Sequence, residues 1–185
     1  MGEQKERMLR GELYRYDDPD LRADHVRAQL LLERFNATSV VDTGERRAIL
    51  EELLGEIGAD VEIKPRFLCD YGYQTTVGEG TFINYGAIFL DCAPITVGRH
   101  CQVATNVQLL TATHPLEPGP RRDGWESAHP IVIEAGVWLG GGAIVCPGVT
   151  IGEDTVVGAG SVVVEDLPSG VLAVGSPCRP IRELG

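Results

Sequence analysis

The chain has 185 residues, enough for one domain with a substantial core, with or without a small appendage. Its 27 acidic side chains outnumber 16 lysines and arginines, and the formal charge of −11 argues against a nucleic-acid-binding protein, which presents a basic face to phosphates. The N-terminal residues are charged where a signal peptide needs an apolar run, and no apolar stretch approaches membrane-spanning length. We therefore expect a cytoplasmic protein whose partners are small molecules or copies of itself, with neither nucleic acid nor membrane.

The cysteines form an odd, scattered set without the paired spacing of a zinc site. They are Cys69, Cys92, Cys101, Cys146 and Cys178. They are predicted to be reduced thiols in the core or in turns, and no metal site is expected.

Residues 1–58 are predicted to form an N-terminal helical cap. A helix start is indicated at Asp17 to Pro19, and apolar side chains follow on one face as far as Asn36. A second helix is expected from Thr43, a residue suited to an N-cap, to a stop at Gly58. The cap would then hold two or three short helices.

Beyond Ala59 the helical period gives way to a period of six residues. Large apolar residues follow this step at Val77, Ile83, Phe89, Ile95, then Val97, Val103, Leu109, and again at Ile133, Leu139, Val145, Ile151, Val157 and Val163. A period of six fits neither a helix nor a strand alone, so each unit is predicted to be one short strand and one corner. Stacked coils would bury the aliphatic side chains in a continuous column. A β-sandwich would instead need alternating strands with turns about every 8 to 12 residues.

The fold class indicated is mainly β, a parallel β-helix of hexapeptide repeats. It is predicted over residues 59–173, with an inserted loop at 111–130 and a C-terminal tail at 174–185.

Several motifs in the same order carry a resemblance to a known family. They include residues 8–21 (MLRGELYRYDDPDL), 69–73 (CDYGY), 89–94 (FLDCAP), 111–115 (TATHP), 137–140 (VWLG) and 176–182 (SPCRPIR). The chain resembles the hexapeptide-repeat acyltransferases, and within them the maltose and galactoside O-acetyltransferases, with the maltose enzymes most similar. The resemblance implies a left-handed β-helix, against the usual right-handed crossover preference. It also implies a homotrimer with sites between subunits, acetyl-CoA as co-substrate and a sugar hydroxyl as acceptor.

Acetyl transfer to a hydroxyl needs a base, because an unactivated alcohol is a poor nucleophile at neutral pH. Histidine suits that task. His25 falls in the helical cap and is expected to be solvated, His100 falls at a repeat corner, and His129 is near the end of the loop. His114 begins the loop, where the catalytic histidine of the family falls, and is therefore the predicted base.

No protein nucleophile is required, because a thioester already carries an activated acyl group. Direct attack in a ternary complex is the simplest mechanism. An acyl-cysteine intermediate is the competing idea, but Cys92 and Cys146 stand at repeat positions with no matched base nearby.

The resemblance also implies two sets of binding residues. The acceptor side consists of Asp17, Asp70, Asn84, Asp91 and Glu126, where Glu126 could alternatively orient His114. The cofactor side consists of Trp138, Gly141, Ala159, Val164, Glu165, Arg179 and Arg182. Small residues let a backbone approach the pantetheine arm, and paired guanidinium groups suit phosphates. Relatives commonly carry Thr-Lys where this chain has Val164-Glu165, which puts side-chain contacts to the cofactor in doubt there.

Other functions fit the pattern less well. A metal-dependent hydratase on the same fold needs three histidine ligands, and the required His-x4-His pair is missing. A non-catalytic β-helical scaffold would leave the loop, Trp138 and arginine motifs unexplained, and the polar candidates would then only satisfy corners of the coil. Within the acetyltransferases, an antibiotic or lipo-oligosaccharide hydroxyl remains an alternative acceptor.

Overall fold

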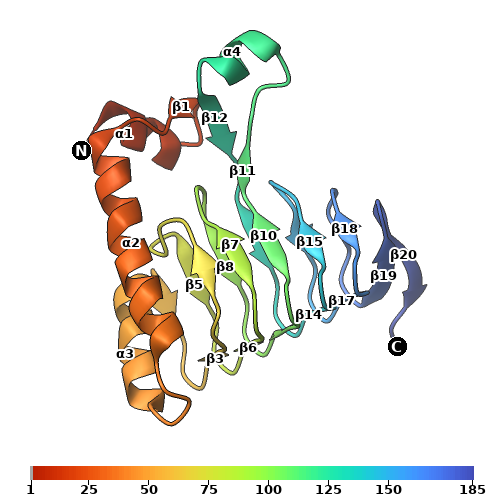
Figure 1. The fold of residues 1–185 in the computed structure, drawn as a ribbon. Helices are drawn as coiled ribbons and strands as arrows, with labels where there is room; N and C mark the ends of the chain where they lie inside the picture. The colour runs from red at the N-terminus through yellow and green to blue at the C-terminus, as the bar shows by residue number, and fades with distance from the viewer. Residues whose placement is uncertain (1) are drawn as a thin grey trace.

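Three helices precede the first coil of a long β-helix (Figure 1). The computed structural model describes residues 2–185, and these first helices are α1 (Glu3–Leu9), α2 (Pro19–Ala37) and α3 (Thr43–Leu53). Asp18 is the N-cap of α2: its carboxylate accepts a hydrogen bond from the Asp20 N–H at 2.8 Å and another from the Gln4 N–H at 3.0 Å. One carboxylate thus caps α2 and ties α1 to it.

The amide of Asn36 joins the end of α2 to the first coil. Its Nδ2 donates to the Phe67 carbonyl at 2.9 Å, and its Oδ1 accepts from the Phe67 N–H at 3.0 Å. Below this contact the helical cap and the coils share one apolar core, which runs from Phe35 and Leu53 into the β-helix. The cap therefore closes one end of the β-helix and buries its first apolar residues.

Helix α3 ends at Leu53, so the prediction that it continues to Gly58 is wrong. The Gly55 N–H donates to the Thr75 carbonyl at 3.0 Å, and the Gly58 N–H to the Val77 carbonyl at 2.8 Å. These donors are already bonded to the next coil. A Cβ at Gly55 would lie 2.4 Å from the Tyr73 carbonyl oxygen, so only glycine permits this approach.

The predicted parallel β-helix is confirmed, with strands stacked in three ladders. One ladder contains β2 (Glu56–Ile57), β5 (Thr75–Val77), β8 (Ile95–Val97), β13 (Ile131–Ile133) and β16 (Thr150–Ile151). The second contains β3 (Glu62–Ile63), β6 (Phe82–Ile83), β9 (Gln102–Val103), β14 (Trp138–Leu139), β17 (Val156–Val157) and β19 (Val171–Gly175), closed by antiparallel β20 (Cys178–Glu183). The third contains β4 (Leu68–Cys69), β7 (Ile88–Leu90), β10 (Gln108–Leu110), β15 (Ile144–Val145) and β18 (Val162–Val163).

The six-residue step does mark the inward positions. Its clearest members have no exposed surface: Ile133, Leu139, Val145, Ile151, Val157 and Val163 are each 0% exposed. The earlier members from Val77 to Leu109 are also buried. The aliphatic column predicted from the sequence therefore forms the core.

The predicted interruption of the coils is an ordered arm. After β10 the chain forms a hairpin of β11 (Ala112–Thr113) and β12 (Trp125–Ala128), with α4 (Pro118–Arg122) at its tip. The N-terminal strand β1 (Tyr14–Arg15) adds to this hairpin beside β12. Figure 1 shows the arm projecting from the side of the β-helix towards α1 and β1. No helix within residues 2–185 is long and apolar enough to cross a membrane.

The column can be tested at Leu139, which is fully buried between coils. Leu139→Ala removes buried apolar volume that the stacked coils cannot refill, so the free energy of unfolding should fall by about 2–5 kcal/mol. The urea midpoint of unfolding measures this. Val26→Ala, on the exposed face of α2, is the matched control and should leave the midpoint nearly unchanged. A Leu139→Ala midpoint equal to that of the control would contradict the central position of the column.

Candidate active site

His114 stands at the start of the arm, directly after β11. Its side chain is exposed, and its Nδ1 lies 3.4 Å from the Trp125 carbonyl oxygen on the opposite strand of the hairpin. A carbonyl can only accept, so this contact favours the tautomer with the proton on Nδ1. The other ring nitrogen, Nε2, is then left with a free electron pair, as a general base requires.

Glu126 lies one residue beyond that carbonyl, on β12. Burial raises the pKa of its carboxyl, while a contact with Tyr14 and the charge of His114 oppose the rise, and Asp70 adds to it. Glu126 is therefore within electrostatic reach of both His114 and Asp70. Two of the predicted acceptor residues and the predicted base share one region.

Asp70 follows β4, at the end of the β-helix beside the helical cap. Its Oδ2 accepts a hydrogen bond from the Cys92 thiol at 3.3 Å, and its side chain is 27% exposed. Burial beside this carboxylate raises the pKa of Cys92, which keeps the thiol protonated. Cys92 thus acts as a donor that holds Asp70, and the protonated thiol disfavours the acyl-cysteine alternative at this position.

Asp91 has no exposed surface. Its Oδ1 accepts from the Tyr71 N–H at 2.8 Å and the Asp70 N–H at 3.1 Å, while its Oδ2 is buried without a hydrogen-bond partner. Burial raises the pKa of this carboxyl to about 7. This geometry favours a role for Asp91 in fixing the main chain that presents Asp70.

His25 is not the solvated residue that the sequence suggested. Its Nδ1 lies 4.0 Å from Asp70 Oδ1, and its ring meets Tyr16 and Tyr71 edge-on, with ring centroids 6.0 Å and 6.3 Å apart. Helical periodicity gives no signal for this contact, because His25 reaches Asp70 across the junction between cap and coil. His100 does occupy a corner, with φ of 56°.

The remaining acceptor candidates are Asp17 and Asn84. Asp17 forms an ion pair with Arg15 on the cap. Asn84 follows β6 and lines a shallow hollow of about 150 Å³ with Gln102, Ala104 and Trp138, on another face of the β-helix. A single chain therefore does not bring Asn84 together with His114.

Trp138, Gly141 and Ala159 lie on the same side as this hollow, on or shortly after strands of the second ladder, whereas Val164 and Glu165 follow β18 of the third ladder. Trp138 on β14 is 53% exposed, and the Gly160 N–H donates to the Gly141 carbonyl at 2.9 Å, linking the corners of two successive coils. A Cβ at Gly141 would meet Thr105 only at ordinary contact distance, 3.4 Å. Packing within the chain does not demand glycine there, and Ala159 beside Gly160 is exposed.

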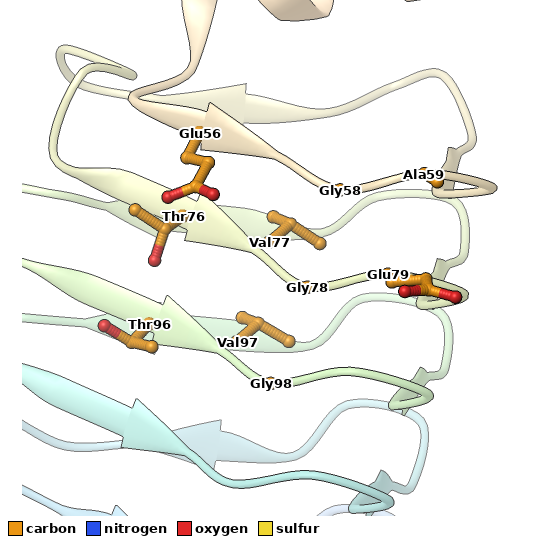
Figure 2. Close-up of a pocket in the computed structure, with 10 residues that line it drawn as sticks. All are labelled: Glu56, Gly58, Ala59, Thr76, Val77, Gly78, Glu79, Thr96, Val97 and Gly98. Carbon is orange, nitrogen blue, oxygen red and sulfur yellow. The ribbon is translucent and has the colours of Figure 1, made fainter.

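A larger hollow of about 420 Å³ lies on the first ladder, where Gly58, Gly78 and Gly98 stack on successive coils (Figure 2). A Cβ at Gly78 would come within 2.5 Å of the Arg99 nitrogen, so glycine is needed for the coils to stack. Its lining includes Glu56 and Glu79 but no histidine or cysteine. We assign this hollow to the scaffold.

No group of three or more His, Cys, Asp or Glu side chains among residues 2–185 is arranged to hold a metal ion. The five cysteines are free thiols.

Comparison with known proteins decides the family. The maltose acetyltransferase hexapeptide capping motif matches residues 7–58, and the bacterial transferase hexapeptide model matches residues 130–164. A maltose O-acetyltransferase from Clostridium difficile 630 is 41% identical, with a TM-score of 0.97 over 98% of this chain and 97% of that one. This chain belongs to the hexapeptide-repeat acetyltransferases.

Two further solved structures support the same group. A galactoside acetyltransferase in complex with coenzyme A is 31% identical, with a TM-score of 0.94 over 98% of this chain and 91% of that one. A hexapeptide-repeat acetyltransferase from Vibrio cholerae O1 biovar eltor, complexed with acetyl coenzyme A, is 37% identical, with a TM-score of 0.92 over 98% of each chain. The predicted membership of the maltose and galactoside group is thereby confirmed.

The C-terminal hairpin of this acetyltransferase carries the two predicted phosphate ligands on β20. Arg179 Nη2 lies 3.3 Å from Glu165 Oε1, so the anion at the unusual Val164-Glu165 step pairs with one of the two arginines. Both side chains are exposed, at 48% and 68%, and such a pair is weak. Arg182 lies on the same strand, opposite Leu172.

The raised pKa of Asp91 predicts a pH dependence of stability. Since the folded protein holds this proton to about pH 7 and an unfolded aspartate only to about pH 4, stability should decline as pH rises through that window. Asp91→Asn keeps an oxygen for the two N–H donors and removes the titration. Its urea midpoint should decline less than that of the wild type between about pH 5 and pH 8.

The exposed Asp60 supplies the control, since Asp60→Asn changes a carboxyl at a solvated corner. It should keep the wild-type pH dependence. A decline of equal size in wild type and Asp91→Asn would show that Asp91 is ionised in the folded protein.

Proposed function

We propose that this acetyltransferase moves the acetyl group of acetyl-CoA to a hydroxyl of a small sugar of the maltose, glucose or galactoside class. The observation that carries the proposal is the His114 hairpin: Nδ1 faces a backbone carbonyl, and the free Nε2 shares its region with Glu126 and Asp70. Carboxylates accept hydrogen bonds from sugar hydroxyls, which suits an acceptor beside a base.

The reaction proceeds by direct attack. Nε2 of His114 takes the proton of the acceptor hydroxyl as its oxygen bonds to the thioester carbonyl carbon. The carbon–sulfur bond then breaks, and the imidazolium returns the proton to the leaving thiolate, giving acetylated sugar and coenzyme A. A backbone N–H stabilises the oxyanion between these steps.

The acceptor is held from four directions in this proposal. Asp70 accepts from acceptor hydroxyls, with Asp91 and Cys92 fixing its main chain and side chain. Asp17 approaches from the cap and Glu126 from the arm. Asn84 joins from the other face, which requires a second chain.

Cofactor binding is proposed on the Trp138 side of the β-helix. The bound coenzyme A and acetyl coenzyme A of the two relatives support a common cofactor. Gly141 and Ala159 would let the backbone approach the pantetheine arm, and Arg179 and Arg182 would meet the phosphates. At Val164 and Glu165 we expect backbone contacts, since the Glu165 carboxylate is turned to Arg179.

We also propose a homotrimer. A three-sided β-helix has flat faces on which copies can pack, and cyclic symmetry would set the His114 corner of one chain against the Trp138 face of the next. Each trimer would contain three equivalent sites.

The His114→Ala variant tests the proposed base. Its turnover is measured with acetyl-CoA and a screen of sugar acceptors, by detecting the released thiol. Without the base the acceptor must attack while still protonated, so kcat should fall about 10²- to 10⁴-fold. The KM for acetyl-CoA and the melting temperature should change little, because His114 is exposed and outside the column.

His129→Ala is the matched control, since it removes an exposed imidazole at the other end of the same arm. It should retain wild-type kcat. A folded His114→Ala protein that keeps more than about a tenth of wild-type turnover with its best acceptor is incompatible with a general base at this position.

A further inference from the structure

Strand β1 joins the helical cap directly to the hairpin that carries His114. It pairs antiparallel with β12, and the register sets Tyr14 opposite Glu126 and Arg15 opposite Trp125. Side chains directly opposite in an antiparallel pair point to the same face, with Cβ atoms about 4.5–5.5 Å apart. Tyr14 and Glu126 are therefore immediate neighbours, although they lie far apart in the sequence.

The ring of Tyr14 is 0% exposed and packs in a second apolar cluster with Met8, Leu21 and Ala128. This cluster spans the cap and the hairpin. The guanidinium of Arg7, 5.7 Å from the centre of the Trp125 ring, adds a further contact between the same two elements. The position of the hairpin relative to the β-helix thus depends on the cap.

The hydroxyl of Tyr14 is buried and lacks a hydrogen bond of normal geometry in this structure. Burial is the largest cause of the raised pKa of Tyr14. Its polar neighbours, the Cys92 thiol and the Glu126 carboxylate, raise this pKa further. A phenol of this kind stays protonated and can donate. In turn, its contact lowers the pKa of Glu126 against the effect of burial.

We propose that Tyr14 is a positioning residue: its hydroxyl holds the Glu126 carboxylate beside His114, so that strand β1 of the cap is part of the catalytic apparatus. A carboxylate held there stabilises the imidazolium that forms when His114 takes the acceptor proton. The inference rests on the proposed role of His114 as base.

The test is a double-mutant cycle of Tyr14→Phe and Glu126→Gln, read as kcat, KM for acetyl-CoA and melting temperature. Tyr14→Phe removes one buried hydroxyl and keeps the ring. Loss of one hydrogen bond to a charged group should lower kcat about tenfold, with KM for acetyl-CoA and melting temperature unchanged. In the Glu126→Gln background the same change should have almost no effect on kcat, because the charge it positions is gone.

Tyr73→Phe is the matched control, since Tyr73 also has a buried, unpartnered hydroxyl but is not paired with β12. It should keep wild-type kcat. Full kcat in Tyr14→Phe, an equal loss in both backgrounds, or a loss of kcat that accompanies a fall in melting temperature would each overturn the proposal. Failure of the proposed base would appear separately, as turnover retained by His114→Ala.

Discussion

Hydrogen bonding between successive coils is the constraint on which the rest of this structure depends. At each coil the N–H groups donate to carbonyls of the next, as from Gly140 to Val157 at 2.7 Å and from Cys146 to Val163 at 2.9 Å. The backbone is therefore hydrogen-bonded along the whole β-helix, and two side chains in six fill its interior, one from the aliphatic column and one from two residues before it. Such a scaffold is stiff, and its regular coils leave chemistry to the corners, the inserted arm and the two ends.

This three-sided scaffold also separates the two halves of the proposed site. His114 follows β10, the middle strand of the third ladder, and β11, whereas Asn84 follows β6 and Trp138 lies on β14, both of the second ladder. The base and the acceptor carboxylates gather where the cap meets the arm, and most of the cofactor candidates lie on the second ladder. A rigid β-helix cannot fold these faces together, which is why the proposed site draws on a second chain.

Sequence periodicity was sufficient to predict the column, because each coil repeats the same local requirement for an inward aliphatic side chain. It also located the interruption that carries His114. It did not predict the end of α3, since Ile57 satisfies both the helical stripe and an inward strand position. The glycine contacts that end the helix involve residues of the next coil.

The cap contacts were beyond prediction for a different reason. Tyr14 meets Glu126, and His25 meets Asp70, through the docking of one segment on another, which leaves no periodic signal. A strand of two residues is also too short to show alternation. The family resemblance named most site candidates, but it did not reveal that Asp91 is fully buried or that Glu165 pairs with Arg179.

A shared site is tested most directly by mixing two inactive variants. His114→Ala lacks the base, and Ala159→Trp fills the proposed cofactor groove at an exposed position. Random co-assembly sets an intact His114 against an intact groove at about one interface in four, so the mixture should recover up to roughly a quarter of wild-type turnover. The double variant mixed with wild type provides the reference for reassembly. Mixtures of the single variants that stay inactive, while wild type regains full activity under the same conditions, would contradict a site built from two chains.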